Sequence, residues 1–118
     1  MQSHSLTRFF NNYITIYRKK GEGDAFGGVS QKWDKYLWEI PVRIHGQSGA
    51  SFRIAMEGKE FAVDKKMICE RDLDVQRGDK IKDDNAGDIY IVIGIKPIRE
   101  VKKIHHLECY LSRIEAIE

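Results

Sequence analysis

Apolar and polar residues alternate along several segments of the chain, which is the pattern of strands with one buried face. Segment 38–45 is the clearest example, and Glu39, Arg43 and His45 lie on its polar face. Its predicted apolar face consists of Trp38, Ile40, Val42 and Ile44. Pro41 has no backbone N–H to donate, so this strand is expected at a sheet edge or at a bulge.

Other segments show the same period of two. Residues 88–95 are β-branched and apolar on both faces, as expected of the most buried strand of a domain. Residues 13–17 predict a first strand and residues 61–69 a further one. A final strand over 106–112 is expected to pair with 88–95, because its apolar residues also alternate.

Turn-forming residues separate these segments. The cluster 83–87 predicts the loop of a β-hairpin between 80–82 and Ile89, and Arg77-Gly78-Asp79 predicts a second turn. Helical periodicity is weak throughout. About five to seven short strands, with turns every 8–12 residues or so, predict an all-β fold, either a small antiparallel β-barrel or a sandwich.

Two stretches do not fit a compact barrel. Residues 21–28 contain four glycines and predict a wide, mobile turn. Residues 46–58, bounded by glycines at both ends, form a longer loop than a hairpin needs, and connections of that length are functional or disordered. Its alternating Phe52, Ile54 and Met56 are more apolar than an idle surface loop requires.

Composition indicates one globular domain, spanning residues 1–118. Hydrophobic residues make up 42% and charged residues 32% of the 118 positions, close to the globular average. The longest apolar stretch, 89–95, is far shorter than the run of about 20 residues that crosses a bilayer, so no membrane contact is expected. The first ten residues lack the apolar core of a secretory signal, which predicts a cytoplasmic chain.

The net charge of +2 favours neither nucleic acid nor membrane, but its distribution is uneven. Residues 57–88 hold most of the acids, and residues 1–12 are expected to be a flexible arm. The first 20 residues hold no acid and four basic residues: Arg8, Arg18, Lys19 and Lys20. This asymmetry suggests a contact surface, and ordinary solvated faces are the alternative.

Candidate chemistry is sparse. Cys69 and Cys109 have the apolar neighbours of buried thiols and no zinc-ligand spacing. His105 and His106 are adjacent, so in a regular strand they point to opposite faces and cannot share a metal. The sequence contains no nucleophile elbow, no HExxH and no P-loop, so neither catalysis, a metal nor a cofactor is expected.

A small basic barrel could also bind nucleic acid as an OB-like or SH3-like module, with aromatic side chains stacking on bases. The candidates for such a platform are Tyr13, Tyr17, Trp33, Tyr36 and Trp38. Packing into the core is the other interpretation of these residues, and the alternation around Trp38 favours it.

The order of several short motifs resembles that of phage head completion proteins. The first are a strand ending in Tyr17-Arg18, the turn Asp24-Ala25-Phe26-Gly27, and Trp33. They continue with Val42-Arg43-Ile44, the turn Arg77-Gly78-Asp79-Lys80-Ile81, the strand Ile89-Tyr90-Ile91-Val92 and a closing strand over 106–114. The resemblance covers about residues 13–114 and rests on order and spacing, since each motif alone is common in small barrels. The family is that of stopper, or head-closure, proteins of long-tailed phages.

The resemblance implies a small antiparallel β-barrel with a long loop between early strands. Such proteins form a homo-oligomeric ring below the portal and adaptor and close the DNA exit channel after packaging. By position, the 46–58 segment is similar to the loop that projects into this channel. Its candidate residues are Gly46, Gln47, Ser48, Gly49, Phe52, Arg53, Ile54, Met56 and Gly58.

The implied partners are the adaptor above, tail proteins below and the end of the packaged double-stranded DNA. Adaptor contacts are expected at Arg8, Arg18, Lys19, Lys20 and Phe26. The resemblance implies a virion protein assembled in the host cytoplasm, and we expect a monomer when it is free, because no strand is expected to expose an apolar face. A tail-completion or tail-terminator protein of the same interface stays an alternative, as does the OB-like or SH3-like module.

Overall fold

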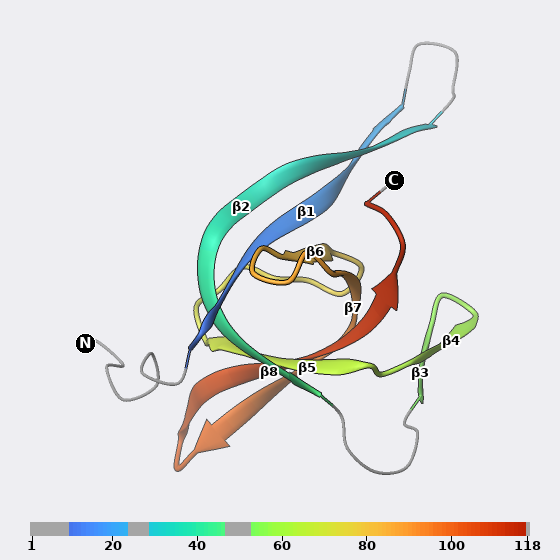
Figure 1. Cartoon of the computed structure of the whole chain (residues 1–118). Helices are drawn as coiled ribbons and strands as arrows, with labels where there is room; N and C mark the ends of the chain where they lie inside the picture. Colours follow the sequence, from blue (N-terminus) through green and yellow to red (C-terminus); the bar gives the residue numbers. More distant parts are fainter. Residues whose placement is uncertain (1–9, 24–28, 47–52, 118) are drawn as a thin grey trace.

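The structure, a computed structural model, describes residues 10–23, 29–46 and 53–117, with the side chains of 20–23 and 29–31 left out. The described residues form eight strands and no helix. The strands are β1 (Asn12–Gly23), β2 (Val29–Gly46), β3 (Arg53–Met56), β4 (Lys59–Ala62), β5 (Lys65–Glu70), β6 (Lys80–Asp83), β7 (Ile89–Glu100) and β8 (Lys103–Ile114). Figure 1 shows their arrangement.

Six of the strands close into an antiparallel barrel in the order β1-β2-β5-β8-β7-β6, while β3 and β4 form a separate two-stranded sheet beside it (Figure 1). This confirms the expected all-β fold and decides for the barrel over the sandwich. Within the described ranges, no helix is long and apolar enough to cross a membrane.

In the barrel wall, alternate residues of the strands point inward, and their side chains fill the interior. Its fully buried members are Ile14, Ile16, Val42, Met67, Cys69, Ile81, Tyr90, Val92, Cys109 and Leu111. Burying an aliphatic side chain of this size contributes about 1.5–3 kcal/mol each, so this interior is the main source of stability. The prediction of two buried thiols is confirmed, and the sulfur atoms of Cys69 and Cys109 lie 4.0 Å apart.

The expectation that β7 is buried on both faces is also confirmed. Tyr90 and Val92 point into the barrel, whereas the equally buried Ile93 packs with Met56 and Val63 in a second cluster. Val92 and Ile93 can both be buried because successive strand residues point to opposite faces and both faces of β7 are covered here. The register shift between Val92 and Gly94 then inverts the alternation, so that Ile95 packs against the barrel core. The predicted hairpin between β6 and β7 is present as well.

The predicted apolar face of segment 38–45 is wrong at Trp38, whose side chain is 56% exposed. Ile14 pairs with Ile40 but Ile16 pairs with Leu37, so β2 carries an extra residue there. Such a bulge inverts the alternation, and Leu37 takes the inward place predicted for Trp38. Pro41 pairs with Tyr13 on one side, and on the other side the β2–β5 ladder begins only at Arg43, so Pro41 lies on an unpaired edge of β2, as its missing N–H predicts.

Three other boundaries differ from expectation. The predicted strand 61–69 is two strands, β4 and β5, interrupted at Val63-Asp64. The predicted turn 21–28 is shorter, because the β1–β2 ladder continues to the pair Gly23 and Val29. The predicted loop 46–58 is not a single loop, since Gly46 ends β2 and 53–56 form β3.

The prediction that His105 and His106 face apart is also wrong. Ile98 pairs with His106 and Arg99 with Ile104, so His105 is the extra residue of a second bulge. The two Nδ1 atoms therefore lie 2.8 Å apart, within hydrogen-bond distance.

Candidate functional site

The segment between β2 and β5 leaves the barrel and returns to the same place. Gly46 at the end of β2 is the ladder partner of Lys65 at the start of β5. Between them, β3 and β4 pair antiparallel around Glu57 and Gly58, which both have positive φ angles (52° and 76°). Positive φ at both turn residues is the geometry of a tight hairpin turn whose twist matches that of the strands.

The β3–β4 hairpin packs against the outer wall of the barrel. Met56 is only 6% exposed and contacts the cluster around Ile93, and Ile54 packs against the same cluster. Gly94 on β7 makes this approach possible, because a Cβ there would lie 3.2 Å from Ile54 Cδ1 and from Tyr110 Cδ2. Two of the three apolar residues predicted for channel closure are therefore anchored to the barrel.

The other predicted residues of this segment are distributed differently. Arg53 is exposed at the start of β3, and Gly58 lies in the hairpin turn. Four candidates lie outside the described residues: Gln47, Ser48, Gly49 and Phe52. Their role in closing a channel stays a prediction.

Tyr110 supports the same cluster from β8. Its hydroxyl donates a hydrogen bond to Glu108 Oε1 over 2.8 Å, and burial together with this carboxylate raises the pKa of Tyr110 to about 12. Burial alone would raise the pKa of Glu108, but the hydrogen bond from Tyr110 and the charge of Lys66, 3.5 Å away, lower it overall. Glu108 is therefore an anion at neutral pH.

A second charged centre joins β1 to the turn before β6. The Nε and Nη2 atoms of Arg18 donate to the two carboxylate oxygens of Asp79 over 3.0 and 2.8 Å. Asp79 is 3% exposed and also accepts a hydrogen bond from the backbone N–H of Gln76. The hydrogen bonds that Arg18 donates to Asp79 raise the pKa of Arg18 further above its usual range.

Arg18 has two further neighbours outside this buried pair. Its guanidinium lies 4.0 Å from the centre of the Tyr36 ring and 3.4 Å from Asp74. The Tyr36 hydroxyl also donates to Asp74, and the hydrogen bonds from Tyr36 and Arg18 lower the pKa of Asp74. The predicted adaptor contact at Arg18 is thus engaged within its own chain, and that role stays a prediction.

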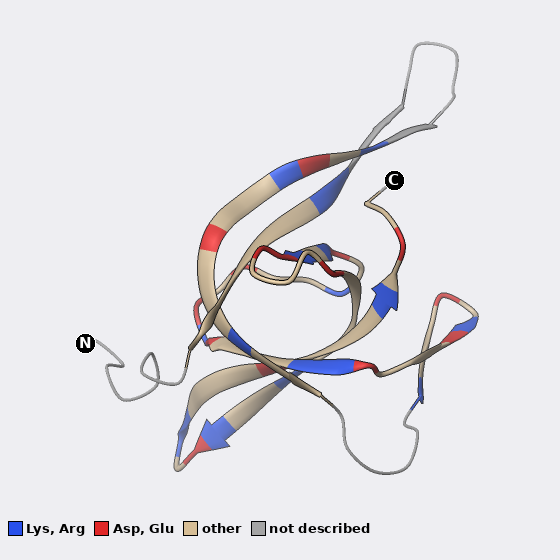
Figure 2. Ribbon diagram, viewed as in Figure 1, with Lys and Arg blue, Asp and Glu red and all other residues tan. Residues whose placement is uncertain are grey.

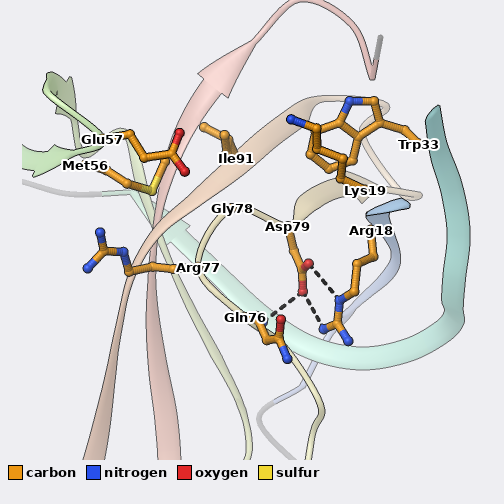
Figure 3. A pocket seen from close by; sticks show the side chains of 10 residues that line it. All are labelled: Arg18, Lys19, Trp33, Met56, Glu57, Gln76, Arg77, Gly78, Asp79 and Ile91. Atoms are coloured by element: carbon orange, nitrogen blue, oxygen red, sulfur yellow. Dashed lines mark hydrogen bonds and ion pairs between the residues drawn. The ribbon is translucent and has the colours of Figure 1, made fainter. Parts of the chain in front are cut away.

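An open groove of about 270 Å³ lies beside the Arg18–Asp79 pair (Figure 3). Its apolar wall comes from Trp33, Met56 and Ile91, and its cations from Lys19 and Arg77. Lys80 Nζ lies 4.1 Å from the centre of the Trp33 ring and donates to the carbonyl of Ile117. Glu57 and Asp79 also line the groove, so Lys19, a predicted contact residue, lies in a groove that combines apolar side chains with charges of both signs.

The structure does not describe the remaining predicted contact residues. Arg8 and Phe26 are outside the described residues, as is the side chain of Lys20 on β1. Among the described residues, no three His, Cys, Asp or Glu side chains come together as a metal site.

Two surface features escaped the sequence reasoning. Tyr13 (54% exposed) and Trp38 (56% exposed) lie on the outside of β1 and β2, so the prediction that these aromatic residues fill the core is wrong for both. It is wrong for Tyr36 as well, which is 38% exposed. The second feature is the basic far end of the β7–β8 hairpin, which the run of Lys and Arg around residue 101 could have indicated.

None of the protein-family models matches the chain, and no curated protein matches its sequence. The chain is similar in fold to several solved structures, among them the following three. Protein SF1141 from Shigella flexneri 2a has a TM-score of 0.64 and 17% identity, covering 88% of this chain and 92% of that one. A chain in the virion of a native gene transfer agent particle has a TM-score of 0.59 and 13% identity, covering 91% and 97%.

The third structure is the phage-like element PBSX protein xkdH from Bacillus subtilis, with a TM-score of 0.56 and 18% identity over 86% of this chain and 92% of that one. In all three comparisons most of both chains is matched, so the likeness extends to the whole barrel. At these identities it is the fold that is shared.

Proposed function

We propose that this chain is a structural virion protein of the phage head-to-tail interface, a stopper that closes the portal channel after DNA packaging and offers the tail its attachment surface. One observation carries the proposal: the barrel is similar, over 91% of this chain and 97% of the other, to a chain of a gene transfer agent virion. The likeness to a protein of the phage-like element PBSX and the order of the sequence motifs support it.

The segment that leaves the barrel between Gly46 and Lys65 is the proposed closing element. Its two ends are ladder partners, so it can reach away from the barrel without disturbing the six-stranded wall. Met56 and Ile54 hold this segment against the barrel through their contacts with the Ile93 cluster, whereas Arg53 is exposed. Basic and acidic residues nearly balance in the described part of this segment, which fits closure of a channel better than tight binding of DNA.

The test is genome retention by filled heads that carry a shortened segment. Residues 50–56 are replaced by a Gly-Ser turn; because this also removes the packed Ile54 and Met56, the free variant must first keep wild-type hydrogen exchange in the six barrel strands. The control is the K59A/E60A double variant, which removes one charge of each sign from the other strand of the same hairpin. We expect both variants to bind heads, and only the first to leak DNA. Retention at the wild-type level by the shortened variant would contradict the closing role.

Assembly offers an independent check. Free chain at micromolar concentration should sediment as a monomer, and a ring should form only on a portal–adaptor template, where the effective concentration of neighbours is high. The expectation that no strand exposes an apolar side chain is wrong at Tyr13 and Trp38, which offer surface for self-association, so sedimentation tests the monomer directly. A stable ring without partners would contradict templated assembly.

Exposed Tyr13 and Trp38 also favour a second candidate function, binding of single-stranded nucleic acid. Lys35 Nζ lies 5.7 Å from the centre of the Trp38 ring, so a cation accompanies the exposed aromatic face. Base stacking on such a ring contributes about 1–3 kcal/mol per base. This function predicts that labelled oligothymidine binds the wild type and that W38A weakens binding about tenfold or more; absence of wild-type binding removes it.

A further inference from the structure

The far end of the β7–β8 hairpin stands clear of the barrel. β8 pairs with β5 only as far as His106, and β7 pairs with β6 only as far as Ile91. The β7–β8 pairing nevertheless continues to Glu100 and Lys103. Residues 98–105, which we name the distal ribbon, therefore form a two-stranded extension that projects past the barrel wall (Figure 1).

The distal ribbon carries more cations than acids. It carries Arg99, Lys102 and Lys103 against a single acid, Glu100, whose carboxylate lies 3.5 Å from His105 Nε2. Within the described ranges, no carboxylate forms an ion pair with any of the three cations. All three are exposed, and Figure 2 shows basic positions on both strands of the ribbon near its tip.

Shape and charge together point to one partner. The major groove of B-DNA is about 12 Å wide and admits a two-stranded β-ribbon, and Lys and Arg side chains bind the phosphates that border it. Only one acid opposes the three cations, and it is turned toward His105, so little in the ribbon repels a polyanion. We propose that the distal ribbon is a sequence-independent binding site for the phosphates of duplex DNA.

The inference rests on the proposed function only in its choice of polyanion, since packaged duplex DNA is what a head-to-tail component would meet. The site itself is a property of the isolated chain. Three phosphate contacts per subunit make the affinity of a monomer weak and strongly dependent on salt: the logarithm of the binding constant should fall with the logarithm of salt concentration with a slope of about −2.7. A ring would add these contacts together.

The experiment is a nitrogen–proton NMR titration of the free, full-length chain with a duplex of about 21 base pairs, two helical turns, at low salt. Expected are shifts confined to residues 96–106 and the predicted salt slope. The variant R99Q/K102Q/K103Q should lose at least tenfold in affinity. The matched control K32Q/K59Q/K82Q, which removes the same charge elsewhere, should lose less than twofold.

Several results would overturn the inference: shifts centred outside the ribbon, equal losses in the two triple variants, or binding of single-stranded DNA or polyglutamate as tight as that of the duplex. The last result would indicate a general anion site rather than one shaped for a groove. Genome retention is measured separately, so the two proposals can fail independently. If the shortened segment causes the expected leak but the ribbon binds no DNA, this inference is wrong and the proposed function stands. If the ribbon binds DNA but the shortened segment causes no leak, the closing role is wrong and this inference stands.

Discussion

Arg18 and Asp79, which lie 61 residues apart in the chain, form a bidentate ion pair in which both carboxylate oxygens accept from the guanidinium over 3.0 and 2.8 Å. Asp79 is almost fully buried, whereas the neighbouring Asp74, which contacts the same guanidinium, is half exposed. The pair fixes the turn before β6 against β1 and so holds the barrel closed at the β1–β6 seam.

We therefore expect Asp79→Asn to lower the free energy of unfolding by about 2–3 kcal/mol, because it leaves a partly buried guanidinium without its main counter-charge. The matched substitution Asp74→Asn should lower it much less, since exposed ion pairs contribute little. Urea unfolding of both variants measures the difference. Equal effects would mean that burial does not distinguish the two carboxylates.

Replacement of Gly94 should loosen the β3–β4 hairpin rather than the barrel. A Cβ at this position meets Ile54 and Tyr110 at 3.2 Å, so Gly94→Val must displace Ile54 from the outer wall. We expect faster amide hydrogen exchange in residues 53–62, with exchange in β6 and the inner positions of β8 unchanged. Gly58→Ala, at the tip of the same hairpin where an added Cβ meets nothing within 4 Å but the φ is positive, serves as a control for hairpin strain alone. Uniformly faster exchange would show that the hairpin and the barrel unfold together.

Val101 should be replaceable by glycine with a gain in stability. It has a φ of 60° and is 94% exposed, so it combines a conformation that β-branched residues avoid with a side chain that packs against nothing. Val101→Gly relieves a strain of about 1–2 kcal/mol and loses part of this to unfolded-state entropy. The thermal midpoint should rise by about 2–5 °C. Val101→Ala, which keeps a Cβ at positive φ, should gain less; a lower midpoint for the glycine variant would contradict the argument.

Acid should weaken the fold through His106. Burial, together with the charge of His105, lowers the pKa of His106, and nearby Glu108 only partly opposes this. Between the lowered folded pKa and the unfolded value near 6.5, the unfolded chain binds more protons. The stability that neutral His106 gives the folded state is therefore fully present above about pH 6.5 and is lost as the pH falls through the folded pKa.

The measurement compares the wild type with His106→Gln by urea unfolding between pH 7.5 and pH 5. The stability of the wild type relative to the variant should decline as the pH falls. Because the two Nδ1 atoms are 2.8 Å apart, only one of them can carry a proton in this contact, so both rings cannot be charged without separating. A difference that does not change with pH would show that His106 titrates normally.

Features set by neighbouring residues could be predicted from the sequence. The two buried faces of β7, the β6–β7 hairpin and the buried thiols all follow from alternation and turn residues that lie within a few positions of one another. The exposed Trp38 could not be found this way, because one extra residue between Leu37 and Ile40 inverts the alternation. The contact of His105 with His106 was missed for the same reason.

The candidate site was predicted only in part. The segment 46–58 stood out through its glycines and apolar residues, but its fold into a hairpin depends on the Glu57-Gly58 turn, which differs from the Asn-Gly and Asp-Gly pairs that mark such turns most strongly. The packing of Ile54 against Gly94 and the Arg18–Asp79 pair each join residues 40 or more positions apart. Local patterns carry no information about such contacts.

The pairing of Gly46 with Lys65 also bears on how this protein can diverge. Everything between these two residues is inserted at a single point of the barrel rim, so its length and sequence can change while the order and register of the six barrel strands remain the same. Chains that share this barrel can therefore carry inserts of different length and sequence at this one point. The same point is a natural place to graft a foreign peptide.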